Sequence, residues 1–208
     1  MLEEVISNEF DKEYGTRFYR IYKKKLGFEL MATKQALIYL SACLRKFKPM
    51  TILELGAGIG TMTDAILSHP YHPKLLYTVE QNEFCLEQLT LNLSHHPRNK
   101  YKVLTIKTDI INLWLDPDLI VADGGFNTME EFRGTKLGTV FFVEGKRTVT
   151  RNMFKEYLPS NWTIDFKEYG VTYKWSKGKI YRLGIPCPRI HRKKGCWIGQ
   201  VKERREIA

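Results

Sequence analysis

The residues with the clearest potential for chemistry are three glycines at alternate positions, Gly56, Gly58 and Gly60, which follow the acidic residue Glu54. The apolar run before them is typical of a buried strand, and the residues after them can begin a helix. Glycine adopts positive φ and has no Cβ atom, so a ligand can approach this backbone closely. A dinucleotide fingerprint would place its third glycine one position later. The loop is therefore predicted to bind a ligand of another kind, with a ligand-free glycine-rich turn as the alternative.

A second acidic residue, Glu80, follows the apolar run Leu75–Val79 and lies twenty positions after Gly60. A carboxylate at the tip of such a strand can accept hydrogen bonds from both hydroxyls of a ribose. An acidic residue at the start of a helix also stabilises the helix dipole without any ligand. Both roles stay open for Glu80 when it is considered alone.

Each of the next three strand-like runs is also followed by an acidic residue, and these are Asp109 after 101–106, Asp123 after 118–122 and Glu144 after 139–143. Ligands of open α/β sheets bind beyond the carboxyl ends of the strands, so Asp123 is expected to face the cleft. Asp123 could instead cap the following turn. Glu144 could instead form an ion pair with Lys146, Arg147 or Arg151.

Strand and helix patterns alternate from residue 51 to about residue 166, which predicts an α/β fold. The expected sheet is doubly wound and mostly parallel, with helices on both of its faces. Two further strand-like runs, 162–166 and 179–183, bring the number of expected strands to seven.

The segment Glu54-Leu-Gly-Ala-Gly-Ile-Gly60 resembles the first motif of the class I S-adenosylmethionine-dependent methyltransferases, and the resemblance extends over roughly residues 33–184. It implies a Rossmann-like sheet that ends in an antiparallel strand, with the runs 162–166 and 179–183 paired as a closing hairpin. It also implies S-adenosylmethionine as cofactor. It also implies that Glu80 binds the ribose and that Asp109 and Ile110 flank the adenine. The cofactor-binding residues it implies are Glu54, Leu55, Gly56, Ala57, Gly58, Gly60, Glu80, Gln81, Asp109, Ile110 and Asp123.

The layout is also similar to that of the catechol-type O-methyltransferases, which hold a metal with an aspartate after the fourth strand and an Asp-Asn pair after the fifth. This chain has Asp123 at the first place but Glu144-Gly145 at the second. One ligand is therefore missing, and no metal-binding residue is predicted, although a divalent metal stays an alternative. Asp123 and Glu144 are the predicted catalytic residues. The predicted reaction is methyl transfer to a hydroxyl of a small-molecule acceptor.

Two other functions stay open. The run from Gly56 to Asp64 also looks like the first motif of rRNA adenine dimethylases, but Asp123-Gly-Gly-Phe126 lacks the proline and the adjacent aromatic residue of their amine-clamping loop. Methylation of a base amine is therefore disfavoured, but an RNA methyltransferase that uses a basic tail for nucleic-acid binding stays the first alternative. A protein that keeps the cofactor fold without catalysis is the second.

Three parts of the chain are expected. Residues 1–49 are a helical extension on the lid and acceptor side, residues 50–185 are the S-adenosylmethionine-binding core, and residues 186–208 are a basic tail. The formal net charge of the chain is +10, and this tail holds seven Lys and Arg against two Glu. Such a tail can bind nucleic acid, or it can be a solvated end.

The remaining composition points to a cytoplasmic protein. The sequence contains no apolar run long enough to span a membrane and does not begin with a secretory signal pattern, so no membrane partner is expected. The four cysteines do not suggest a disulfide framework. Cys187, His191 and Cys196 could supply three ligands to zinc, but their spacing fits no common zinc pattern. The sequence leaves the oligomeric state and the acceptor unidentified.

Overall fold

The computed structural model describes residues 5–104, 116–123, 135–145, 148–156, 158–172, 179–182, 185–188 and 194–203. The helices are α1 (Glu9–Tyr22), η1 (Phe28–Leu30), α2 (Lys34–Phe47), α3 (Thr61–Leu67), α4 (Glu83–Asn92), η2 (Arg98–Lys100) and α6 (Thr148–Glu156). The strands are β1 (Thr51–Leu55), β2 (Leu75–Val79), β3 (Tyr101–Leu104), β4 (Leu119–Ala122), β5 (Val140–Glu144), β6 (Trp162–Ile164), β7 (Lys167–Thr172), β8 (Lys179–Arg182), β9 (Ile185–Pro188) and β10 (Lys194–Glu203). None of the helices in the described part of the chain is both long and apolar enough to cross a membrane.

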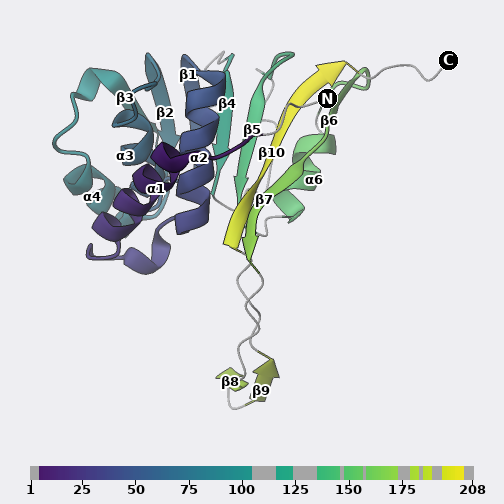
Figure 1. The fold of residues 1–208 in the computed structure, drawn as a ribbon. Coiled ribbons are helices and arrows are strands. Elements are labelled where there is room, and N and C mark those ends of the chain that lie inside the picture. The colour runs from purple at the N-terminus through teal and green to yellow at the C-terminus, as the bar shows by residue number, and fades with distance from the viewer. Residues whose placement is uncertain are drawn as a thin grey trace.

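The main sheet has eight strands in the order β3-β2-β1-β4-β5-β10-β6, and β7 pairs with β10 beside β6 (Figure 1). The five strands from β3 to β5 are parallel to one another. β10 runs antiparallel to β5, β6 and β7. The chain starts the sheet in the middle, at β1, and builds outward on both sides, which is the doubly wound arrangement. The expected α/β class, with a mostly parallel sheet and an antiparallel C-terminal strand, is confirmed.

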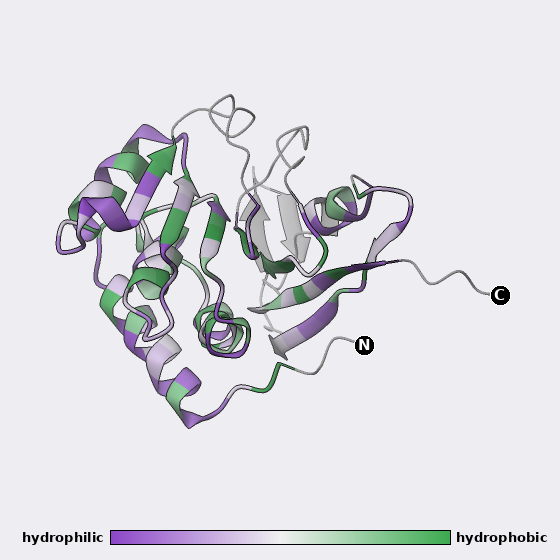
Figure 2. Ribbon diagram, turned by 90° about the horizontal axis from the view of Figure 1, so that it is seen from above, coloured by the Kyte–Doolittle hydropathy of each residue, from purple (hydrophilic) through white to green (hydrophobic). Residues whose placement is uncertain are grey.

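Two apolar layers hold the helices to the sheet, because alternate residues of each strand point to opposite faces. Ile52 of β1 belongs to the layer under α1, α2 and α3, whereas Leu53 belongs to the layer under α6. Figure 1 shows α2 in front of the strands and α6 behind them. Apolar residues run through the strands when the sheet is seen from above (Figure 2). Helices therefore cover both faces, as the sequence predicts.

The C-terminal strands differ from the expected hairpin. β6 and β8 do not pair with each other, because β6 pairs with β10 and β8 pairs with β9. β6 and β7 follow each other along one edge of β10, opposite residues 201–203 and 194–198 respectively. The prediction of a hairpin between 162–166 and 179–183 was wrong, since the order of strands along the chain does not fix which of them pair.

β10 lies within the segment that we expected to be a basic tail. Cys196, Ile198 and Val201 are buried on this strand, and Lys194, Lys202 and Glu203 stand at its ends. The charged residues make the segment resemble a solvated tail in sequence, but its centre is apolar enough to pack in the sheet. Cys196 is fully buried and burial raises its thiol pKa well above the ordinary value. The tail assignment therefore does not describe residues 194–203, which are an interior strand.

A buried polar network attaches α1 to α2 and to the segment after α3. The Asp11 side chain accepts hydrogen bonds from Asn8 N over 2.9 Å and from Ser41 Oγ over 2.8 Å. The Arg45 guanidinium donates to Asp11 Oδ2 from Nε over 3.2 Å and from a terminal nitrogen over 2.8 Å. Ser41 also contacts His69 Nε2 over 3.2 Å. The N-terminal extension is therefore fixed against the body of the protein by specific bonds as well as by apolar packing.

Candidate functional site

The glycine loop between β1 and α3 has the backbone that its sequence predicts. The φ angles of Gly56, Gly58 and Gly60 are +83°, +54° and +91°, in the region that favours glycine. Val79 O, at the end of β2, accepts hydrogen bonds from Gly56 N and Ala57 N, each over 3.0 Å. These two hydrogen bonds therefore fix the loop to the end of the neighbouring strand β2.

Glu80 connects the second strand to the same loop. Gly58 N donates to Glu80 Oε2 over 2.7 Å, and Gln81 N and Asn82 N donate to Oε1 over 2.8 and 2.9 Å. These three bonds hold the carboxylate in one orientation beside the glycines. A carboxylate has about four acceptor sites, so a further hydrogen bond from a ligand hydroxyl can still be accepted.

Glu54 lies at the centre of this end of β1 and is 0% exposed. Thr63 Oγ1 and Thr78 Oγ1 donate to Glu54 Oε2 over 2.6 and 2.7 Å. Glu54 Oε1 is buried and has no hydrogen-bond partner among the described residues. Burial raises the pKa of Glu54 to about 7, because desolvation outweighs the hydrogen bonds from the two threonines. Buried polar atoms of folded proteins nearly always have a partner, so the free oxygen fits a donor such as the ammonium group of S-adenosylmethionine.

The raised pKa of Glu54 makes a prediction about stability. The folded pKa of about 7 exceeds the ordinary value of 4.5, so the folded state binds more protons between these two pH values. The free energy of unfolding should therefore fall as pH rises from about 4.5 to 7, by up to about 3 kcal/mol. Glu54→Gln removes this titration, so the stability of the variant relative to the wild type should increase by that amount between pH 5 and pH 8, read from urea unfolding.

The wild type has to be compared with the variant because His69 changes the free energy of unfolding in the opposite direction as pH rises. Burial lowers the pKa of His69 to about 4, so its contribution to stability increases with pH between about 4 and 6.5. His69 is present in both proteins and cancels in the difference. A stability difference between wild type and Glu54→Gln that stays constant over the pH range would contradict the assignment of the raised pKa to Glu54.

The two predicted catalytic residues lie at the carboxyl ends of adjacent strands. Ala122 of β4 pairs with Val143 of β5, so Asp123 and Glu144 come next on neighbouring parallel strands. Asp123 N donates to Leu55 O over 2.9 Å, which places this residue beside the start of the glycine loop. The two residues differ in exposure, since Asp123 is half-buried and Glu144 is buried. The backbone of Asp123 therefore lies beside the end of β1, and its catalytic and cofactor-binding roles stay predictions.

Glu144 has a contact that the sequence did not suggest. Its Oε1 accepts a hydrogen bond from Thr33 N over 3.2 Å, at the N-terminus of α2. A carboxylate at this position satisfies a backbone N–H at the start of a helix. This bond gives Glu144 a role in attaching α2 to the sheet. Its predicted catalytic role stays a prediction.

The other predicted cofactor residues divide into two sets. Leu55 is buried at the end of β1, Ala57 N donates to Val79 O, and Gln81 follows Glu80 in the segment after β2. All three lie, with Glu54 and Glu80, at the carboxyl ends of β1 and β2. Asp109 and Ile110 lie outside the described residues, so their assignment to the adenine stays a prediction.

The sequence did not show that η1 lies over the glycine loop. A Cβ atom on Gly58 would lie 2.9 Å from Leu30 O, and one on Gly27 would lie 2.7 Å from the ring of Phe84. Phe28, Leu30 and Phe84 are large apolar side chains that remain exposed around this contact. A signal was available in the run Gly27-Phe-Glu-Leu-Met31, where apolar residues follow a glycine outside any long helix pattern. The N-terminal extension therefore contributes apolar surface next to the loop.

Comparisons with known proteins find similarity of structure. No protein-family model matches the sequence, and no curated protein sequence matches it. The precorrin-6y C5,15-methyltransferase of Geobacter metallireducens superposes with a TM-score of 0.57 at 15% identity, over 85% of this chain and 92% of that chain. The O-methyltransferase of Bacillus cereus, in complex with S-adenosylhomocysteine, superposes with a TM-score of 0.57 at 14% identity, over 95% of this chain and 93% of that chain.

A candidate RNA methyltransferase of Pyrococcus horikoshii also superposes, with a TM-score of 0.53 at 14% identity, over 90% of this chain and 98% of that chain. The three proteins differ in the acceptors that their names state, which agrees with the rule that one fold supports several functions. What they share with this chain is the arrangement of strands and helices over nearly their whole length. The chain has the fold of the class I S-adenosylmethionine-dependent methyltransferases.

Proposed function

We propose that this protein is an S-adenosylmethionine-dependent methyltransferase that methylates a hydroxyl of a small-molecule acceptor. The observation that carries the proposal is the bond from Gly58 N to Glu80 Oε2, which joins the glycine loop to the carboxylate at the end of β2. Together they form a site for an adenosine-containing ligand, with the loop against its polar chain and Glu80 at its ribose. The buried free oxygen of Glu54 adds an acceptor for an ammonium group.

The cofactor supplies a methyl group that its sulfonium already activates. The chain then has to align the acceptor and remove its proton. We assign the second task to Asp123, because it is half-buried and its backbone lies beside the start of the glycine loop. Glu144 is the last residue of the neighbouring strand β5, and it can assist Asp123 or position α2 through its bond to Thr33. Phe28, Leu30 and Phe84 offer an apolar surface for the body of the acceptor.

The cofactor assignment is tested by isothermal titration with S-adenosylhomocysteine, with and without Mg²⁺ and with NAD as the control ligand. We expect one site with a dissociation constant in the micromolar range, unaffected by Mg²⁺, and no binding of NAD. No binding of S-adenosylhomocysteine, or binding of NAD in its place, would contradict the proposal. Transfer of a labelled methyl group to a panel of hydroxylated aromatic acceptors then tests the acceptor class, and turnover separates an enzyme from a non-catalytic binding protein.

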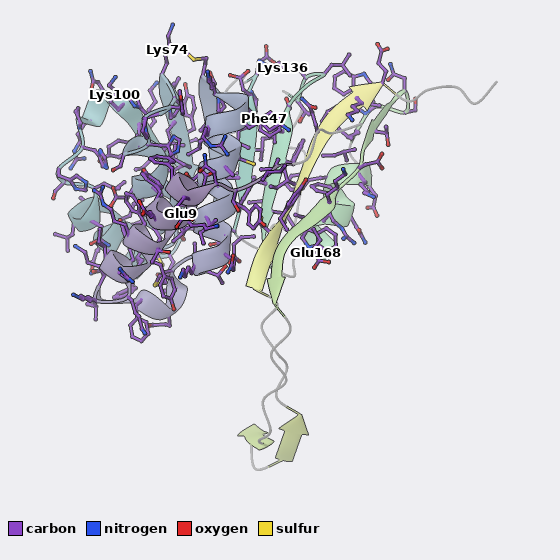
Figure 3. The ribbon with its side chains drawn as sticks, viewed as in Figure 1. Glu9, Phe47, Lys74, Lys100, Lys136 and Glu168 are labelled. Atoms are coloured by element: carbon purple, nitrogen blue, oxygen red, sulfur yellow. The ribbon has the colours of Figure 1, made fainter. Side chains whose placement is uncertain are left out.

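RNA as acceptor is the second candidate, because the formal net charge is +10. Exposed lysines such as Lys74 and Lys100 project from the surface (Figure 3). Binding through such residues would weaken steeply with salt. The two candidates are separated by measuring RNA affinity at several salt concentrations beside the methyl-transfer assay. RNA methylation with salt-sensitive binding would replace the small-molecule assignment and leave the cofactor assignment in place.

A further inference from the structure

Two histidines converge on a buried aspartate of α3, the helix that follows the glycine loop. The ligand atoms of Asp64, His95 and His96 all lie within 4.8 Å of one another. His96 Nε2 is 2.8 Å from Asp64 Oδ1, and His95 Nε2 is 3.4 Å from the same oxygen. Asp64 is on α3, and the histidines belong to the connection between α4 and η2. None of these three residues is among the predicted cofactor-binding or catalytic residues, although Tyr22 OH bonds both Asp64 Oδ2 and Gly60 O of the glycine loop.

The aspartate of the cluster is held in place by other residues. Tyr22 OH lies 3.1 Å from Asp64 Oδ2, and Ser68 Oγ lies 3.1 Å from Oδ1. The Asp64 side chain is 8% exposed, whereas that of His95 is 57% exposed. Hydrogen bonds of this kind, made by groups behind a ligand, orient the ligands of metal sites. The buried side of the cluster is thus preorganised, and the His95 side is open to water.

The geometry lets all three groups reach one metal ion. The rings of His95 and His96 are 4.1 Å apart between centroids, and one nitrogen of each ring lies near the same carboxylate oxygen of Asp64. Zn²⁺ bonds of about 2.0–2.1 Å in a tetrahedron place ligand atoms about 3.3 Å apart. The distance of 3.4 Å between His95 Nε2 and Asp64 Oδ1 already matches this value. The distance of 2.8 Å between His96 Nε2 and Asp64 Oδ1 has to widen by about 0.5 Å, which a small rotation of the carboxylate provides.

We propose that Asp64, His95 and His96 bind a divalent transition metal ion of the Zn²⁺ type. Two imidazole nitrogens and one carboxylate oxygen are ligands that suit Zn²⁺ and its neighbours, and water completes the coordination on the exposed side. A metal there joins α3 to the connection that precedes β3. Because the three ligands converge only in the folded chain, the metal stabilises the folded state.

The test uses the full chain without a histidine tag, treated with a chelator and then titrated with ZnCl₂. We expect one Zn²⁺ site by calorimetry, a metal-dependent rise in Tm and visible absorption when Co²⁺ is used. His95→Ala is the main variant, because His95 is largely exposed and its loss should leave the fold intact. It should weaken Zn²⁺ binding at least about 100-fold, the upper end of what loss of a supporting group costs.

His72→Ala is the matched control, since His72 is exposed and lies outside the cluster. It should bind Zn²⁺ as the wild type does. Asp64→Asn removes the charged ligand and should also abolish the Co²⁺ spectrum. The proposal fails if the wild type shows no Zn²⁺-dependent rise in Tm, or if His95→Ala and the wild type bind Zn²⁺ with equal affinity.

Discussion

Glu80→Ala is expected to weaken the binding of S-adenosylhomocysteine by about 100-fold or more. A hydrogen bond to a charged acceptor contributes about 1.5–3 kcal/mol, and the three backbone bonds leave the Glu80 carboxylate one acceptor site for a ribose hydroxyl. The substitution also removes the acceptor of Gly58 N, Gln81 N and Asn82 N, so the glycine loop loses its attachment to the end of β2. Titration calorimetry at one fixed salt concentration measures the effect.

Glu83→Ala is the matched control, because it removes an exposed carboxylate three residues later at the start of α4. Its affinity should stay within about twofold of the wild type, as for a surface substitution. An analogue that lacks the ribose hydroxyls separates contact with the ligand from support of the loop. The wild type should bind this analogue more weakly than it binds S-adenosylhomocysteine. Glu80→Ala should bind the analogue and S-adenosylhomocysteine with equal affinity. Unchanged affinity in Glu80→Ala would refute the ribose assignment.

Asp11→Ala should lower the free energy of unfolding by about 3 kcal/mol, near the lower end for breaking a buried ion pair. Asp11 is 0% exposed and accepts hydrogen bonds from Asn8, Ser41 and Arg45. Its loss leaves the Ser41 hydroxyl and the Arg45 guanidinium without this acceptor and removes the capping box of α1. The effect is less than the full penalty because the Arg45 side chain is 33% exposed and can be hydrated. Urea unfolding at pH 7 provides the measurement.

Glu13→Ala serves as the comparison, since it removes an exposed carboxylate from the same helix. Its effect should stay within about 0.5 kcal/mol. If Asp11→Ala and Glu13→Ala changed stability equally, the network between α1 and α2 would not be what holds the N-terminal extension. A normal S-adenosylhomocysteine affinity in Asp11→Ala at low temperature would show that the network acts on stability and not on the ligand site.

The sequence predicted the central strands well because their signals are local. β2 has the bounds Leu75–Val79 that its apolar run suggested, and the strand before the glycine loop, β1, ends at Leu55, directly before Gly56. α2, within the expected helical extension 1–49, begins directly after Thr33, whose side chain accepts a hydrogen bond from Ala36 N. Each of these elements is bounded by residues that act on their own neighbours, such as a cap or a glycine turn.

The pairing of the last strands and the clusters of side chains could not be predicted in this way. β10 pairs with strands far from it in the chain, and no local pattern records a partner. His96 and Asp64 are 32 positions apart, and nothing in either segment points to the other. Glu144 contacts Thr33 across 111 positions for the same reason. Sequence reasoning found residues at strand ends because the fold class fixes where strand ends lie, and it missed contacts that depend on how helices pack.

The position of β10 in the sheet has a consequence for biosynthesis. β10 is the last described strand to be translated, but it lies between β5 and the pair formed by β6 and β7. Until residues 194–203 have been made, the nascent chain exposes the backbone edge of β5, whose residues Val140–Val143 are all buried in the finished protein. Open apolar edges of this kind favour aggregation. This sheet can therefore close only after the ribosome has added β10, and a chaperone that covers β5 during translation would protect the unfinished protein.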